Sequence, residues 1–84
     1  MNNTQYDPTA IKRADDIVSD MVAQSPFTLM EVLSRRRGAK LVHTRHAIIH
    51  ELNKQGFSIS IIGDVLNRDP STVSHVINKN KKSI

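Results

Sequence analysis

The chain has 84 residues, no cysteine and a formal net charge of +4. This length suits one small domain, and the lack of cysteine excludes a disulfide framework or a cysteine metal cluster. No run of about 18 apolar residues and no signal-peptide pattern occurs, so the sequence predicts a soluble cytoplasmic protein without a membrane partner.

The first part of the sequence predicts a flexible start and one long helix. Residues 1–7 are polar, and Asp7 and Pro8 combine an N-cap acid with a proline at the first helical position. Apolar residues then recur at helical spacing, which predicts a helix over residues 8–23.

A short helix and a basic loop are expected next. Thr28 and Glu31 have the spacing of a capping box, which predicts a helix over residues 29–34. The following segment, RRRGAK at residues 35–40, contains Gly38 and is therefore expected to form a loop.

A third helix is predicted over residues 44–55, ending at Gly56. Its expected core residues are Ala47, Ile48, Ile49 and Leu52. Ser58 can cap a fourth helix, whose expected apolar face consists of Ile59, Ile62 and Leu66.

The fifth helix follows a polar break, with Asp69 as a possible N-cap and Pro70 at its first position. We expect one domain over residues 8–78 and a basic tail over residues 79–84. No strand pattern is present. The sequence therefore predicts a compact all-α domain of six helices or fewer.

The last two predicted helices are joined by a short turn and have the pattern of a helix-turn-helix. The apolar residues of the second helix are expected to pack against the first, and Gly63 lies where the helices can approach closely. The opposite face of the second helix carries Pro70, Ser71, Ser74, His75 and Asn78.

The polar first turn of the fifth helix favours contact with nucleic acid. Free N–H groups and the positive end of the helix dipole favour a nearby phosphate, and Asp69, Ser71 and Thr72 can reach base edges. Two alternatives stay open at this point. Asp69 caps the helix or accepts a hydrogen bond from a cytosine amino group, and Thr72 faces either the DNA or the core.

The distribution of charge also favours a polyanionic partner. Residues 1–31 have a net charge of −3 and residues 32–84 a net charge of +7, with five bases and no acid between Arg35 and Arg45. Nucleic acid is favoured over a membrane surface, because no basic amphipathic stretch with bulky aromatic residues is present. A solvated charged face is the alternative.

With its elements in this order, the chain from Thr9 to Asn78 resembles the C-terminal DNA-binding domain, domain IV, of the bacterial replication initiator DnaA. The resemblance rests on the VLSRRR segment, on the helix after Arg45 and on SISIIGDVLNRDPSTVSH. The matching positions are Ser58, Ile62, Gly63, Arg68, Asp69, Ser71, Thr72 and Val73. The resemblance implies a helix-turn-helix of the DnaA or Trp-repressor type that binds DnaA-box-like sites in double-stranded DNA.

The resemblance also implies roles for single residues. Arg37, with Arg36 beside it, would enter the minor groove, which suits an arginine on a loop. The major-groove residues would be Asp69, Pro70, Ser71, Thr72, Ser74, His75 and Ser60. The contacts to the DNA backbone would be Arg35, Lys40, Arg45, Lys54 and Arg68, with His46 as the alternative to Arg45.

Two features depart from the initiator pattern. Pro70 replaces the family's histidine and can at best pack against a thymine methyl group. The chain contains no GxxxxGK[ST] nucleotide-binding motif, so it is expected to occupy DNA without driving an ATP-dependent complex. This suits a small stand-alone relative, for example a phage-encoded or regulatory protein. A transcriptional repressor or transposase-type module is the alternative, and NRDPSTVSHVI resembles such proteins too.

Other classes of function find less support in the sequence. His43, His46 and His50 could form a metal site, but no carboxylate lies among them, and we predict no metal and no cofactor. Asp15 and Asp16 are adjacent and point about 100° apart on a helix, so they form no catalytic pair. We therefore predict that the protein is not an enzyme and has no small-molecule substrate. A protein-docking surface formed by Met21, Phe27 and Met30 is a third alternative.

Overall fold

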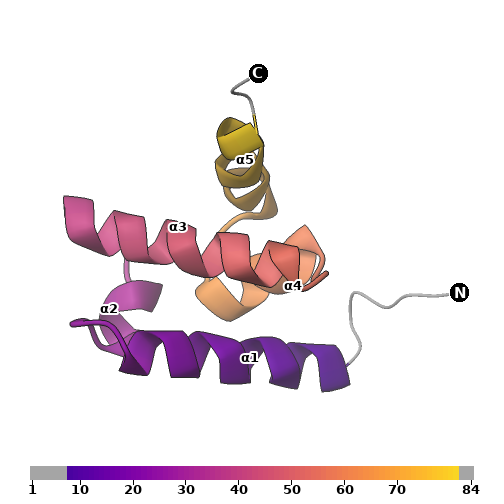
Figure 1. Cartoon of the computed structure of the whole chain (residues 1–84), viewed down its shortest axis with the longest axis horizontal. Helices are drawn as coiled ribbons and strands as arrows, with labels where there is room; N and C mark the ends of the chain where they lie inside the picture. Colours follow the sequence, from indigo (N-terminus) through magenta and orange to yellow (C-terminus); the bar gives the residue numbers. More distant parts are fainter. Residues whose placement is uncertain (1–7, 82–84) are drawn as a thin grey trace, which may run out of the picture.

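The computed structural model describes residues 8–81, which form five helices (Figure 1). They are α1 (Pro8–Ala23), α2 (Leu29–Leu33), α3 (Ala39–Lys54), α4 (Ile59–Leu66) and α5 (Pro70–Lys81). No strand occurs in this part of the chain, so the all-α prediction is confirmed. The regions predicted as a flexible start and as the end of a basic tail, residues 1–7 and 82–84, lie outside the described residues.

The helices are arranged around two long ones, α1 and α3, which lie side by side in Figure 1. At one end of this pair α2 contacts both helices, and toward the other end α4 does so. The fifth helix packs against α3 and α4 and projects away from α1. Its first turn therefore lies near the surface while its apolar side faces the core.

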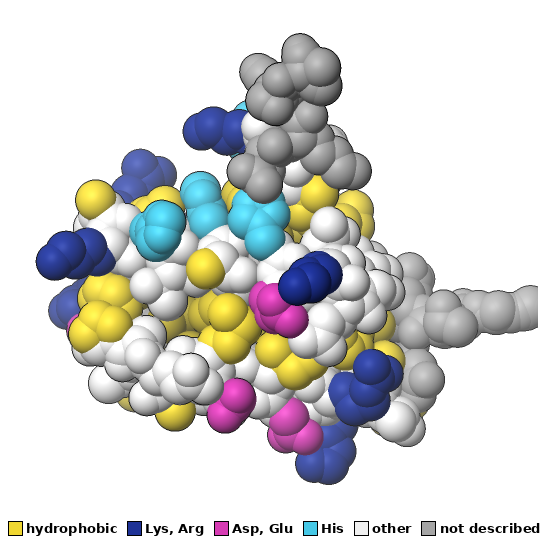
Figure 2. Space-filling model, in the orientation of Figure 1, with side chains coloured by type: hydrophobic (Ala, Val, Ile, Leu, Met, Phe, Trp, Pro, Cys, Tyr) yellow, Lys and Arg dark blue, Asp and Glu magenta, His cyan; other side chains and the backbone are white. Residues whose placement is uncertain are grey.

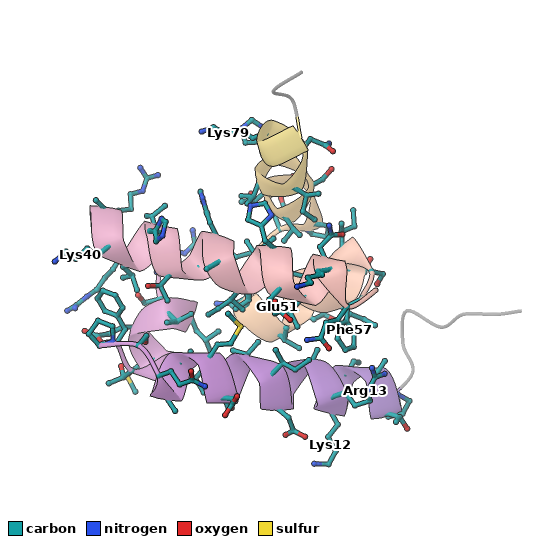
Figure 3. All side chains as sticks on the ribbon, in the orientation of Figure 1. Lys12, Arg13, Lys40, Glu51, Phe57 and Lys79 are labelled. Carbon is teal, nitrogen blue, oxygen red and sulfur yellow. The ribbon has the colours of Figure 1, made fainter. Side chains whose placement is uncertain are left out.

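All five helices contribute to one hydrophobic core. Its most deeply buried large side chains are Val18, Val32, Ile48, Leu52, Ile62, Leu66 and Val73. Burying a side chain of this size contributes roughly 1.5–3 kcal/mol. The end of α1 is also held against the segment before α4, where the Arg13 guanidinium lies 5.0 Å from the centre of the Phe57 ring (Figure 3).

Local capping signals predicted the starts of α1 and α2 correctly. The backbone N–H of Glu31 donates to Thr28 Oγ1 at 3.1 Å, and the N–H of Thr28 donates to Glu31 Oε1 at 2.8 Å. The capping box is thus confirmed. The helix that it starts ends at Leu33, one residue earlier than predicted, with Ser34 as its C-cap.

The third helix begins at Ala39, not at residue 44 as predicted. Its N-cap is Gly38, which has an extended conformation at φ −111° and ψ 148°. Lys40 is therefore helical and does not belong to the loop. The prediction was wrong because the buried side of the helix starts at Leu41, about two turns before the predicted core residues Ala47 and Ile48.

Two predicted core positions also need correction. Ala47 is exposed, and the Ile59 residue is 39% exposed. The buried side of α4 consists of Ile61, Ile62, Val65 and Leu66. These four residues follow the i, i+1, i+4, i+5 spacing of a helix that packs on two neighbours, which places Ile59 at the edge of the core.

The turn between α4 and α5 requires two special backbone positions. Asn67 has a left-handed conformation, with φ +57°, and ends α4. The carbonyl of Gly63 accepts a hydrogen bond from the N–H of Arg68 at 2.8 Å. A Cβ atom at Gly63 would lie 2.5 Å from the Arg68 carbonyl oxygen, so the close approach at this glycine is made mainly by the backbone of the turn and not, as predicted, by the facing helix.

Candidate nucleic-acid interface

The basic segment after α2 is held in place by the side chain of Arg45. This arginine lies on the buried side of α3 and is only 6% exposed. Its guanidinium donates four hydrogen bonds to backbone carbonyls, which belong to Glu31 (3.1 Å), Val32 (2.7 Å), Ser34 (2.9 Å) and Arg36 (2.7 Å). A helix leaves its last four carbonyls without partners in the helix, and Arg45 supplies donors for two of those in α2, Glu31 O and Val32 O, as well as for two carbonyls just after it.

The burial and the hydrogen bonds of Arg45 count against the predicted contact to the DNA backbone, which stays a prediction. Four of its five N–H groups are used within the protein, and the side chain is buried. Burial lowers the pKa of Arg45, and the positive charge of Arg68 lowers it further. The neighbouring His46, the alternative at this position, is half-buried and points into a surface groove.

Arg68 reaches the end of α2 from the turn between α4 and α5 and shares one carbonyl, Ser34 O, with Arg45. Its Nη2 donates to Ser34 O at 2.6 Å, and Nη1 donates to Asn67 O at 3.1 Å, with a longer contact of 3.5 Å to Leu33 O. Burial lowers the pKa of Arg68, with a further contribution from Arg35. The Arg68 guanidinium is thus engaged with the end of α2, although it is half-buried and lines the surface groove, and its predicted contact to the DNA backbone stays a prediction.

We call Arg45 and Arg68 the arginine clamp. The clamp joins the C-terminal end of α2 to α3 and to the turn before α5. Because Ser34 O receives a hydrogen bond from each arginine, the start of the loop over residues 34–38 is tied both to α3 and to the turn before α5. The side chain of Asn67 adds a weak bond of 3.4 Å to Leu33 O.

Three arginines of the loop remain at the surface. Arg35, Arg36 and Arg37 are all exposed. Arg36 forms an ion pair with Glu31, at 3.5 Å between Nη1 and Oε2. Among the residues that the structure describes, Arg37 has neither an ion pair nor a side-chain hydrogen bond, so its guanidinium is available to a ligand.

The first turn of α5 is exposed from Asp69 to Thr72. The Asp69 carboxylate accepts a bond from the Ser71 hydroxyl at 3.3 Å, while the Asp69 backbone carbonyl accepts from the N–H of Thr72 and of Val73. Within the described part of the chain no backbone N–H donates to the Asp69 carboxylate, so it does not cap α5. Thr72 is exposed and therefore does not face the core, and its contact with DNA stays a prediction.

The loop and the start of α5 open onto one groove of about 870 Å³. Its polar lining consists of Arg35, Arg36, Arg37, Arg45, His46, Asn67, Arg68, Asp69 and Thr72, and Val42, Ile49 and Val76 form its apolar floor. Asp69 is the one carboxylate in this lining. The groove is thus strongly positive on the loop side and polar on the α5 side.

Other predicted contact residues lie outside the groove. Lys40 is exposed in the first turn of α3 (Figure 3), whereas Lys54 is in the last turn of the same helix, roughly 21 Å away at a rise of 1.5 Å per residue. Ser60 is half-buried near the start of α4. Ser74 and His75 follow on α5, where Ser74 is half-buried and accepts a bond from Asn78 at 3.4 Å while His75 is exposed.

Three other predictions concern a metal site, a protein-docking surface and a membrane-spanning helix. In the described part of the chain, no group of three or more His, Cys, Asp or Glu residues is placed to hold a metal ion. Met21 and Phe27 pack against the core, whereas Met30 is 80% exposed beside Leu29 and Leu33. None of the helices within residues 8–81 combines the length and apolar character needed to cross a membrane.

Comparisons with protein-family models, with curated proteins and with solved structures gave no match to this chain.

Proposed function

We propose that this protein binds double-stranded DNA, with α4 and α5 as a helix-turn-helix and with the loop over residues 34–38 as a second contact. On this proposal α5 enters the major groove with its first turn, and Arg37 enters the adjacent minor groove. The observation that carries the proposal is the common groove, onto which both the exposed arginines and the exposed start of α5 open.

The geometry of a duplex explains why such a groove supports the proposal. The major and minor grooves of B-DNA are separated by one sugar-phosphate backbone, so a protein that enters both must straddle a row of phosphates. The space between the two contacting elements should therefore be lined with positive charge. Arg35, Arg36 and Arg37 line one side of this space, and the dipole of α5 adds partial positive charge on the other.

The first turn of α5 offers a small set of groups for reading bases. Because the Asp69 carboxylate is not used as a cap, it is free to accept a hydrogen bond from a cytosine amino group. Ser71 can donate or accept, and Pro70 can only pack against a thymine methyl group. This set of groups favours contact with a few base pairs. Because position 70 is proline and not histidine, we expect a different sequence preference from that of a protein with histidine there.

The proposed biological role rests on the sequence resemblance. We propose binding at DnaA-box-like sites, in replication initiation or its regulation, because the basic loop and the SISIIGDVLNRDPSTVSH segment occur together in one chain. The second candidate is a transcriptional repressor or a transposase-type DNA-binding module. Pro70 favours this second candidate, because Pro-Ser-Thr-Val-Ser begins the recognition helix of some such proteins.

Selection from a pool of random duplexes separates these candidates. Recovery of DnaA-box-like sites would support the replication role, and recovery of a palindrome would support a dimeric repressor. Recovery of no preferred sequence, together with no binding of any duplex at low salt, would refute the proposed function. If roughly five phosphates are neutralised, log K should fall with log salt at a slope of about −4 to −5.

Arg37→Ala tests the minor-groove contact in the same assay. We expect it to weaken binding most at sites with an A·T-rich flank, because a narrow minor groove attracts arginine. Lys12→Ala is the matched control, since Lys12 is an exposed base on α1, a helix that contributes no residue to the groove (Figure 3). An equal loss on all sequences would mean that Arg37 contacts only phosphate.

A further inference from the structure

A row of histidines runs along α3 on the side that faces α5. His43, His46 and His50 have the i, i+3, i+7 spacing that places residues near one face of a helix. Figure 2 shows histidine side chains gathered along this edge of the molecule. The distance from His43 to His50 along the helix axis is roughly 10 Å, which corresponds to roughly three base-pair steps of DNA.

His46 is the member of this row that lines the groove. It is half-buried, and burial lowers its pKa from the ordinary value of 6.5, with further contributions from His50, Lys79, His43 and Arg45. Lys79 belongs to α5, so positive groups face His46 from both helices. The other charged groups of the same groove are Arg35, Arg36, Arg37, Arg68 and Asp69.

The surroundings of His46 suit an anion. A half-buried imidazole among cations is harder to protonate in the free protein, because a further positive charge is unfavourable there. A phosphate placed in the groove supplies the missing negative charge. It would favour the imidazolium, which can donate hydrogen bonds from both ring nitrogens.

We propose that the histidine row, His43, His46 and His50, is a second phosphate-binding surface for the same DNA duplex, and that protonation of His46 strengthens its hold. This inference rests on the proposed DNA binding and adds to it a dependence on pH. The DNA complex should take up a proton that the free protein does not hold near neutral pH. Binding should therefore tighten as the pH falls through the ordinary range of histidine.

Affinity for a fixed duplex, measured at pH 7.5 and pH 5.5 at one ionic strength, tests the inference. For the unmodified protein we expect tighter binding at the lower pH, by at most about ten-fold for each pH unit, because one proton is taken up on binding. His46→Gln should bind as the unmodified protein does at pH 7.5 and should lose most of the gain at pH 5.5. Lys12→Gln, which removes a charge away from the groove, should keep the full gain.

A direct titration of the unmodified protein avoids any effect of a substitution on folding. The imidazole resonances of His46, followed by NMR with and without the duplex, should show a higher pKa in the complex. An unchanged or lower pKa would overturn the inference, as would an equal gain in affinity for His46→Gln. Failure to bind DNA at either pH would instead refute the proposed function, so the two failures are distinguishable.

Discussion

Replacing Arg45 with methionine tests whether this residue positions the basic loop or contacts a ligand. Methionine has a similar unbranched stem and fills much of the same space, but it donates no hydrogen bond. Two of the four carbonyls that Arg45 serves keep another donor. Glu31 O still receives the Ser34 hydroxyl at 2.6 Å, and Ser34 O still receives Arg68 at 2.6 Å.

The expected loss of stability comes from the other two carbonyls. Val32 O is bonded to Arg45 Nε in a buried position, and Arg36 O is bonded to Nη1 in a partly buried one. An unsatisfied buried acceptor costs about 1–3 kcal/mol, and a partly buried one costs less because water can reach it. We therefore expect Arg45→Met to lower the free energy of unfolding by about 3 kcal/mol. A domain of this size has a total of roughly 4–13 kcal/mol.

Urea unfolding followed by circular dichroism measures this loss, and thermal unfolding should show a Tm lower by roughly 12–20 °C. Arg37→Met is the matched control, because it removes an exposed arginine and should change stability by less than about 0.5 kcal/mol. Equal stability of the two variants would refute the clamp. Normal stability of Arg45→Met combined with weaker DNA binding would show that Arg45 contacts the ligand directly.

Three further predictions concern the turn, the recognition residues and the histidine row. Gly63→Ala should destabilise the fold by about 2–3 kcal/mol in urea unfolding, because its Cβ would lie 2.5 Å from the backbone oxygen of Arg68. The control is Gly38→Ala, whose Cβ meets nothing within 4 Å and which should lose much less stability. Ser71→Ala should relax the preference at one base position by about 1 kcal/mol in competition binding, and an unchanged preference would remove Ser71 from the interface. Because the pKa of His46 is lowered in the folded state, the stabilisation given by its neutral imidazole should be complete above pH 6.5 and should decline as the pH falls through and below that value. In His46→Gln, this part of the decline should be missing from stability measured against pH.

The elements that could be predicted from sequence are those with local signals. The capping box of Thr28 and Glu31, Ser58 as N-cap and Pro70 at the start of a helix each depend on residues within one turn of one another. The start of α3 does not follow from local signals, because a glycine after three arginines is equally typical of a loop. Glycine is also acceptable as an N-cap, and here the burial of Leu41 extends the helix.

The roles of the arginines could not be predicted from composition, because their partners are distant in sequence. Arg45 bonds to carbonyls 9 to 14 residues away, and Arg68 to carbonyls 34 and 35 residues away. One sequence signal did exist for Arg45. It follows Leu41 by four residues and precedes Ile48 and Ile49 by three and four, so it lies on the buried stripe of its helix.

The clamp also has a consequence for how a ligand would be bound. A loop of surface arginines would ordinarily lose conformational freedom on binding, and that loss would reduce affinity. Here the backbone of the loop is already fixed at Leu33, Ser34 and Arg36, by side chains that come from α3 and from the turn before α5. On the proposed function, the buried arginines thus set the spacing between the minor-groove and major-groove contacts, and the exposed ones supply the charge. Arg68→Met should therefore weaken DNA binding more than the loss of one positive charge explains, because it frees the loop from the turn that begins α5.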